Sequence, residues 1–587
     1  MKFRSALAGF LLLCSACPGG TIHSNDPDGS VPGGDAAPDG APGPDAALPP
    51  SGLVDVLTQH NDIARTGANL AETKLDVAKV AGPSFGKVFA RDVDDQIYAQ
   101  PLIVSGLSMP GAGLRNVVFV ATVGDTVYAY DADDPAATTP LWKQSLLLAG
   151  ERPVRNTDMF GACNGNYTDF SGNIGVVGTP VIDRVTSTLY VVSRSRMVGG
   201  QFVQRLHALS ILDGSERAGS PVVIQASVPG NGDGAHNGVL KFDPLRENQR
   251  AAMLLLDGVL YMTWAGHCDW GPYHGWIMGY DATTLAQVVV HNTTPEGSGG
   301  GIWQAGQGMS SDGTFLYAIT GNGTIGDDTS TGSPVNRGQT IMKLKRSGSA
   351  LHIESWFTPY NYYALEQGDL DLGSAGLLLI PGTNLGVSGG KGGWLYVVDR
   401  DNMGGLTQNQ NADDNVVQTF VLNEPYHLHG SPVYWKGPSG GRVYAWAEED
   451  FLKAFPVLPA ASAQPGQKVL DVDNLEKSLV QAPHQLPGGS YAMPGAMMSI
   501  SADGSKAGTG IIWASMPSSG SANNEVRPGV LRAFDASDVT HELWNSNTNM
   551  DADDCGSFAK FSYPTIANGK VYLASFAHQL CVYGLGQ

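Results

Sequence analysis

The chain has 587 residues, of which 76 are glycine and 15% are charged, and its formal net charge is −20. This acidic balance excludes nucleic acid as the main partner, because binding a phosphate backbone needs clustered lysine and arginine. Abundant glycine beside many aliphatic and aromatic residues is typical of short strands joined by tight turns.

Residues 1–17 have the features of a secretion signal. Two basic residues precede the apolar run 6–13, which is too short to span a bilayer. Small residues before Cys17 resemble the lipobox of bacterial lipoproteins, which implies that this cysteine is acylated, although Cys14 stands where that pattern prefers leucine. We expect export to the bacterial cell envelope and a lipid anchor at Cys17; the alternative is an ordinary cleaved signal.

Residues 18–52 consist mostly of Pro, Gly, Asp and Ala, with almost nothing apolar to bury. Such a composition predicts a disordered tether, followed by a folded body over residues 53–587. Outside the cytosol, the four cysteines of the body predict up to two disulfides. Two of them lie in one terminal unit and could pair, which would leave the other two as the second bridge: Cys555 with Cys581, and Cys163 with Cys268.

A loose motif recurs along the body, in which an apolar strand is followed by a turn and by further strands that carry Tyr or Trp. Eight units open in this way, at residues 99–104, 178–182, 250–258, 299–323, 372–382, 430–434, 495–501 and 562–566. Repeated sets of four short antiparallel strands predict an all-β fold, an eight-bladed β-propeller. The last unit shows three strands, and we expect the unassigned strand 85–93 to complete it and close the ring.

The stretch 299–323 differs from the other units. It has a glycine-rich approach, Trp303, a predicted strand, a Ser-Asp-Gly turn at 311–313 and a second predicted strand that ends near Asn322. Strand, turn and strand indicate a hairpin. Trp303 offers a flat apolar face where glycines let the backbone approach closely; the simpler interpretation is a packing tryptophan.

This stretch and the repeat resemble the quinoprotein dehydrogenases, eight-bladed propellers that bind pyrroloquinoline quinone (PQQ). The resemblance spans roughly residues 53–587 and implies that Trp303, in its GGG-x-x-W segment, is the floor under the quinone. It implies that Asn322, in a Gly-Asn pair, is a calcium ligand. It also implies that Lys391, before a Gly-Gly-Trp-Leu-Tyr-Val-Val-Asp-Arg strand, reaches the quinone carbonyls.

The resemblance further implies a general base that is also a calcium ligand. Asp371 is the first choice for this residue and Asp369 the second, and Asp269 is the nearest match for a carboxylate ligand from the preceding blade. These residue types suit the chemistry, because calcium prefers carboxylate and amide oxygens and a carboxylate can accept an alcohol proton. A lysine can stabilise negative charge on a reduced quinone.

The sequence departs from this family in two respects. It has no adjacent pair of cysteines, and it has no CxxCH motif, so we expect no haem. Other ligand-type groupings are present: His267 and His274 around Asp269, His427 with His429, and the acidic run Asp551, Asp553 and Asp554. The histidine pairs could hold a transition metal, whereas the acidic run lacks the spacing of an EF-hand.

Three functions remain open from the sequence. The first is a quinoprotein-type oxidoreductase that acts on an alcohol or sugar and passes electrons to a separate acceptor. The second is a non-catalytic binding or assembly module with a protein partner in the envelope. The third is a calcium-stabilised propeller that binds a carbohydrate or peptide without chemistry.

Overall fold

The computed structural model describes residue 49 and residues 51–326, 335–407, 414–459, 464–484 and 491–586. The chain divides into the units Met1–Pro38 and Asp39–Gln587, and the first lies outside the described residues. The predicted signal 1–17, its Cys17 and nearly all of the predicted tether 18–52 therefore also lie outside them. Among the described residues, no helix is both long and apolar enough to span a membrane.

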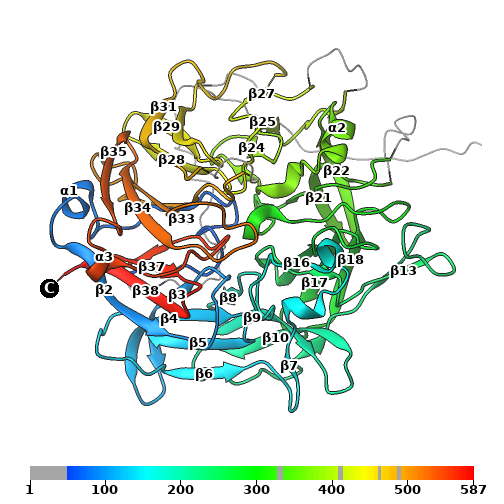
Figure 1. Cartoon of the computed structure of the whole chain (residues 1–587), viewed down its shortest axis with the longest axis horizontal. Helices are drawn as coiled ribbons and strands as arrows, with labels where there is room; N and C mark the ends of the chain where they lie inside the picture. The colour runs from blue at the N-terminus through cyan, green and yellow to red at the C-terminus, as the bar shows by residue number, and fades with distance from the viewer. Residues whose placement is uncertain are drawn as a thin grey trace, which may run out of the picture. The chain divides into compact units, whose positions relative to one another are not determined.

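The second unit is an all-β propeller of eight blades, as predicted, and Figure 1 shows the blades following one another around a centre. The inner strands are β3 (Leu102–Met109), β8 (Val181–Asp183), β15 (Leu254–Leu256), β19 (Ser310–Ser311), β23 (Leu378–Leu379), β28 (Val433–Gly437), β32 (Met497–Ser501) and β36 (Thr565–Ala567). The second strands are β4 (Gly113–Thr122), β9 (Thr188–Arg196), β16 (Val259–Gly266), β20 (Leu316–Ile319), β24 (Leu385–Gly389), β29 (Gly440–Ala445), β33 (Ile511–Pro517) and β37 (Lys570–Ala574).

Each blade continues outward by antiparallel pairing. The third strands are β5 (Thr126–Asp131), β10 (Phe202–Ser210), β17 (Trp276–Asp281), β21 (Ile341–Ser347), β25 (Trp394–Asp399), β30 (Phe451–Pro456), β34 (Gly529–Asp535) and β38 (Gln579–Leu585). The outer strands are β6 (Trp142–Ser145), β11 (Val222–Val223), β18 (Gln287–Asn292), β22 (Ala350–Thr358), β27 (Gln418–Val421), β31 (Glu476–Gln481), β35 (Asp538–Asn545) and β2 (Phe85–Asp92).

The ring closes through β2, which pairs antiparallel with β38 as the outer strand of the eighth blade. This confirms the role predicted for the strand near residues 85–93. It also joins the two ends of the propeller, since β2 precedes the first blade in the sequence. Closure removes the unpaired edges that a linear array of blades would expose.

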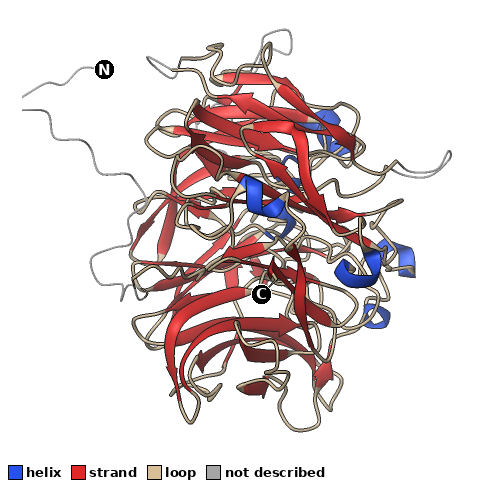
Figure 2. Ribbon diagram, turned by 90° about the vertical axis from the view of Figure 1, so that its left-hand side faces the viewer, coloured by secondary structure: helices blue, strands red, loops and turns tan. Residues whose placement is uncertain are grey.

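Short elements decorate the blades, and Figure 2 shows how little helix there is beside the strands. Additional strands pair at the blade edges or form a separate hairpin: β1 (Ala68–Asn69), β7 (Arg152–Pro153), β14 (Glu247–Asn248), β26 (Gly405–Leu406), β12 (Ser227–Pro229) and β13 (Val239–Lys241). The helices are α1 (Val77–Val80), α2 (Tyr362–Gln367) and α3 (Met550–Asp553), with 3-10 turns η1 (Asn156–Asp158), η2 (Ala162–Gly165), η3 (Gln304–Gly306) and η4 (Leu372–Ser374).

The apolar core lies between neighbouring blades. One cluster joins Val104 and Phe119 of the first blade to Ile182 and Leu189 of the second, and equivalent clusters join the later blades. Because each sheet is covered on both faces, strands such as β5 are buried at every position instead of alternating.

Residues 56–69, named here the inner belt, contact the inner strand of every blade or the residue before it. The hydrogen-bonded pairs are Val56 with Ile103, Leu57 with Ile182, Arg65 with Met253, Ile63 with Ser311, Ala64 with Leu379, Thr66 with Tyr434, Gly67 with Ile500, and Asn69 with Ile566. Apart from the third blade, which the Arg65 side chain reaches, the belt residues follow the ring in blade order. The sequence of this stretch has no alternation of apolar and polar residues that would predict this role.

Candidate functional site

The residues singled out in the sequence lie on loops of one face of the propeller. In an antiparallel blade, the loop between the second and third strands emerges on the same side as the connection to the next blade. Asp269, Asn322 and Lys391 lie in loops of the first kind, in the third, fourth and fifth blades. Trp303 and Asp371 lie in connections of the second kind.

Asn322 connects two of the carboxylates. Its main-chain N–H donates to Asp371 Oδ1 at 2.8 Å, and its side-chain Nδ2 donates to Asp369 Oδ1 at 2.7 Å. The next N–H, of Gly323, donates to Glu366 Oε2 at 2.6 Å. Glu366 was not predicted as a site residue; it lies on α2, in the connection from the fourth to the fifth blade, and joins the cluster through this hydrogen bond.

Lys391 is the cation of this cluster. Its Nζ lies 2.6 Å from Asp371 Oδ2 and 3.5 Å from Asp369 Oδ1. The Asp371 side chain is only 6% exposed, whereas that of Asp369 is 65% exposed. Burial alone would lower the pKa of Lys391, but these carboxylates outweigh it and raise that pKa above its ordinary value. Lys391 is therefore held charged beside Asp371.

Asp269 accepts a hydrogen bond from the Tyr273 hydroxyl at 2.5 Å. The residue is exposed, yet protein atoms partly desolvate its carboxyl, and with the nearby Asp371 carboxylate they raise the pKa of Asp269 to about 6. Cys268 forms a disulfide with Cys163, which ties this loop to the connection before the second blade. The pairing of Cys163 with Cys268, and of Cys555 with Cys581, agrees with the sequence expectation.

Trp303 lies beside these groups and is half-buried. Tyr273 meets it edge-on, with ring centroids 6.4 Å apart. The indole Nε1 is buried and has no hydrogen-bond partner among the described residues. A side chain at Gly321 would meet both neighbours, because its Cβ would lie 2.1 Å from Asp371 Oδ1 and 3.0 Å from Trp303 Cδ1. Glycine is thus needed for this close approach.

A cavity of about 400 Å³ opens at this cluster. Its lining includes the Asn322 side chain and four acidic residues: Asp233, Asp269, Glu366 and Asp369. The volume is in the range that small-molecule sites occupy. The acidic lining favours a cation or a polar neutral ligand over an anion.

The structure thus brings Trp303, Asn322, Asp369, Asp371, Lys391 and Asp269 into one neighbourhood, although their roles stay predictions. The Asn322 Oδ1 accepts from Gln339 at 2.6 Å, and both oxygens of Asp371 have in-chain partners. Calcium at Asn322, Asp371 and Asp269 would therefore have to displace Gln339 and Lys391.

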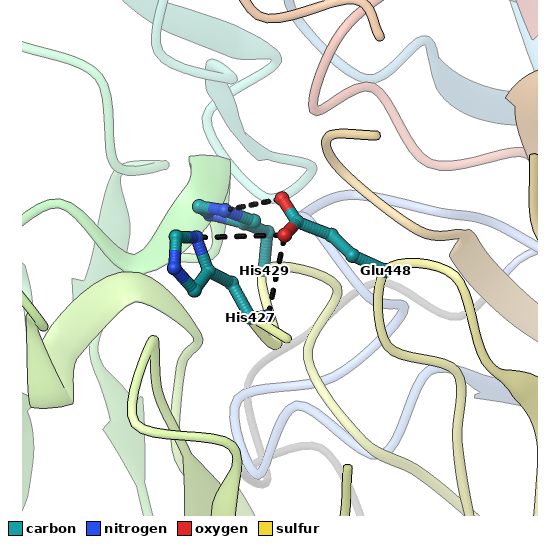
Figure 3. Close-up of side chains that lie close together, drawn as sticks. All are labelled: His427, His429 and Glu448. Carbon is teal, nitrogen blue, oxygen red and sulfur yellow. Dashed lines mark hydrogen bonds and ion pairs between the residues drawn. The ribbon is translucent and has the colours of Figure 1, made fainter. Parts of the chain in front are cut away.

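A second polar cluster lies on the same face, on the sixth blade. His427 and His429 precede β28, and Glu448 lies between β29 and β30. Figure 3 shows both rings directed at the Glu448 carboxylate. Burial lowers the pKa of His427 to about 4 and raises the pKa of Glu448 to about 7. Within the described ranges, these three form the one His/Cys/Asp/Glu group whose ligand atoms converge.

The other ligand-type groupings do not converge among the described residues. His267 Nδ1 contacts the Tyr167 hydroxyl at 2.7 Å, and His274 contacts Thr294 and the Asp233 carbonyl, each at 2.8 Å. Both rings are occupied by structural hydrogen bonds, and neither pairs with Asp269. In the acidic run near the C terminus, Asp553 accepts the main-chain N–H of Lys87 and so anchors β2.

The comparisons with solved structures identify the fold. A quinohemoprotein alcohol dehydrogenase from Comamonas testosteroni has a TM-score of 0.51 and 13% identity, over 91% of this chain and 81% of that one. A quinohemoprotein alcohol dehydrogenase from Pseudomonas putida HK5 has a TM-score of 0.53 and 14% identity, over 91% of this chain and 80% of that one. A europium-containing methanol dehydrogenase has a TM-score of 0.51 and 12% sequence identity. The match covers 90% of this chain and 98% of that one.

The propeller fold is shared with these dehydrogenases. At 12–14% identity the likeness shows a shared fold. Any activity has to be argued from the residues of this chain. No protein-family model and no curated protein sequence matches the chain.

Proposed function

We propose that the protein is a PQQ-type oxidoreductase that oxidises an alcohol or sugar at the face carrying Trp303. The observation that supports this most is the convergence of Trp303, Asn322, Asp371 and Lys391, from four separate loops, on a fold that quinoprotein alcohol dehydrogenases share. The resemblance of the sequence to the quinoprotein dehydrogenases implies a cofactor or substrate role for each of these positions.

The groups around Trp303 fit the flat ring system of a quinone, whereas the acidic lining of the cavity opposes the carboxylates of PQQ. The Trp303 Nε1 is buried without a partner, and Gly301 and Gly321 leave no side chain beside the indole. Lys391 supplies a positive charge next to Asp371. A bound quinone would supply the two-electron acceptor for the oxidation. A separate acceptor would then reoxidise it.

The protein's own groups would position the substrate and hold its proton. Asp371 is the proposed acceptor of the hydroxyl proton at Oδ2, the oxygen that faces Lys391, with Asp369 as the second choice. Asp269, whose pKa is about 6, can exchange a proton near neutral pH. Tyr273 orients Asp269 by donating to its Oδ1.

The test is a titration of the purified full chain with PQQ, with and without calcium, followed by tryptophan fluorescence and by absorbance. We expect micromolar binding that Trp303→Phe and Lys391→Met weaken at least tenfold. Trp394→Phe, on β25 and outside this cluster, is the matched control and should bind as the parent does. Absence of PQQ binding to the parent protein would contradict the proposal.

A second candidate is a propeller that recognises an envelope protein or carbohydrate without a cofactor. The observation that favours it is that Asn322, Asp371 and Lys391 satisfy one another through hydrogen bonds and an ion pair. Retained binding of an envelope ligand by a protein that does not bind PQQ would support this candidate. The screen would test the full chain. Its control would be the Asp369→Ala variant, which alters the exposed rim of the site.

We also propose export and attachment to a membrane through an acylated Cys17. The sequence of residues 1–17 supports this, and so do two disulfides, which persist in oxidising compartments. Cells fed an alkyne-bearing fatty acid should label the parent protein, and Cys17→Ala should abolish the label. Cys14→Ala is the matched control. Equal labelling of both variants would contradict lipidation at Cys17.

A further inference from the structure

We propose that His427, His429 and Glu448 form a binding site for a divalent first-row transition metal such as zinc. The three ligand atoms lie within 4.8 Å of one another. They belong to the sixth blade and share no residue with the cluster around Trp303. The inference is therefore independent of the proposed function.

The separations match a metal site. Glu448 Oε1 lies 3.2 Å from His429 Nε2, and Glu448 Oε2 lies 3.5 Å from His427 Nδ1. Bonds of about 2.0–2.1 Å to a tetrahedral zinc place neighbouring ligand atoms roughly 3.3 Å apart. The two His–Glu separations, which involve different oxygens of the carboxylate, are thus close to this spacing, and Figure 3 shows both rings directed at the carboxylate.

Within the described part of the chain, these three side chains have no ion-pair partner outside the group. The Glu448 side chain is 1% exposed, and among the described residues no lysine or arginine forms an ion pair with it. His429 is 5% exposed, and its buried Nε2 makes no hydrogen bond of good geometry despite the nearby carboxylate. A buried carboxylate facing two imidazole nitrogens needs a shared cation or proton between them.

Hydrogen bonds between the two loops hold the ligands in place. The His427 N–H donates to Glu448 Oε2 at 3.2 Å, the Glu448 N–H donates to the His427 carbonyl at 3.0 Å, and Asn423 Nδ2 donates to the Glu448 carbonyl at 3.0 Å. Supporting contacts of this kind orient metal ligands. The alternation His-Leu-His places both rings on one side of an extended segment, with Leu428 buried on the other.

The site also has an opening. His427 is 21% exposed, and the Tyr491 ring packs against its ring at 5.2 Å. Two histidines and one glutamate leave a position for water or an oxygen-bearing ligand, as in zinc sites that act on substrates. Lys391 is close, because the Leu428 N–H donates to the Gly390 carbonyl at 3.2 Å, but its charge is offset by Asp371.

The test is calorimetric titration of the tag-free full chain with Zn²⁺ after removal of metals by a chelator. We expect one site per chain, weakened at least about 100-fold in Glu448→Gln and His429→Gln, because loss of a ligand exceeds the 10–100-fold cost of losing a supporting contact. Co²⁺ should give the visible absorption of a four-coordinate ion in the parent and lose it in both variants.

Two control variants make the result specific. His484→Gln removes an exposed histidine that pairs with Glu449 at 2.9 Å, and it should leave zinc binding unchanged. Trp303→Phe alters the Trp303 cluster without changing any charge and should also leave zinc binding unchanged, which separates this site from the proposed PQQ site. If His429→Gln does not fold, His427→Gln replaces it. Absence of one-to-one binding, or binding that survives Glu448→Gln, would overturn the proposal.

Discussion

Gly321 is a position where a single methyl group should matter. Alanine would place Cβ 2.1 Å from Asp371 Oδ1, which forces the carboxylate away from the Asn322 N–H and from Lys391. We expect Gly321→Ala to destabilise the protein by about 1–3 kcal/mol, as overpacking does. The thermal unfolding midpoint measures this. Gly172→Ala, where a Cβ meets nothing within 4 Å, is the control, and equal midpoints would contradict the prediction.

His60 should make stability depend on pH. Burial, followed by the Arg65 charge, lowers the pKa of His60 to about 3 from a model-peptide value of 6.5. Between these values the unfolded chain binds a proton that the folded chain does not, so stability falls as pH falls below 6.5. At pH 5 the loss is about 2 kcal/mol relative to pH 7.5.

The measurement compares urea unfolding at pH 7.5 and pH 5.0 for the parent and for His60→Gln. Both proteins share the contributions of their carboxylates, so the difference between the two pH effects isolates His60. The parent should lose more stability on acidification. Identical losses would show that His60 is not held neutral.

At the residue scale, motif reading predicted more of the candidate site than composition could. The resemblance to the quinoprotein dehydrogenases, carried by short motifs, is what indicates Trp303, Asn322, Asp371 and Lys391. Their partners Glu366 and Tyr273, and Glu448 beside the two histidines, carry no such pattern. Only the folded arrangement shows that these residues meet the others: Glu366 on α2, Tyr273 in the loop after β16 and Glu448 in the loop after β29.

At the scale of elements, the loop that carries Asp269 depends on a long-range covalent link. Cys268 and Asp269 both have φ near +50°, a region that residues other than glycine rarely adopt. The disulfide to Cys163 spans 105 residues, whereas the disulfide between Cys555 and Cys581 spans 26. The longer closed loop restricts the unfolded chain more.

We expect removal of the Cys163–Cys268 disulfide to cost about 1 kcal/mol more than removal of the other bridge, from loop entropy alone. Paired serine substitutions at each bridge, compared by chemical unfolding, test this. The first pair should also increase proteolysis near Asp269. A larger loss from the Cys555–Cys581 pair would show that local packing outweighs loop length.

The predicted hairpin at 299–323 is present but shorter than its pattern indicated. Its first strand, β19, has only two residues, since the 3-10 turn η3 follows Trp303 directly. Ala305 within that turn has a φ of 42°, which alternation of residue types does not disclose. The inner strands β8, β15, β23 and β36 are also short, with two or three residues each. The inner belt supplies hydrogen-bond partners at these strands in addition to their own blades.

For the whole molecule, Arg65 is a central connection. It is fully buried and donates to the carbonyls of Met309, Gln59 and Met253 and to the Thr58 hydroxyl. We expect Arg65→Met to lower the free energy of unfolding by about 3–5 kcal/mol, because several buried acceptors lose their donor.

Urea unfolding of Arg65→Met measures this loss. Arg115→Met is the control: it removes an ion pair whose arginine side chain is 43% exposed, which should change stability by less than about 1 kcal/mol. Similar effects of the two substitutions would mean that the Arg65 contacts of the inner belt add little to the free energy of unfolding.

The number of blades and the closure by β2 could be predicted because strand patterns repeat and one strand was left over. The inner belt could not be predicted. Residues 56–69 are largely polar and irregular, and what they bind is backbone from eight separate blades. Main-chain hydrogen bonds of this kind place few requirements on the type of side chain, so a sequence pattern does not predict them.

The inner belt also determines when the protein can be complete. A ribosome releases residues 56–69 before any blade exists, and the partner of Asn69 in β36 lies 497 residues later. The outer strand β2 likewise waits for β38 at the far end of the chain. Such distant pairings form late and slowly. Residues 56–69 are therefore made before the blades but are among the last to find all their places, and a chain interrupted before β36 would leave Asn69 and β2 without their partners.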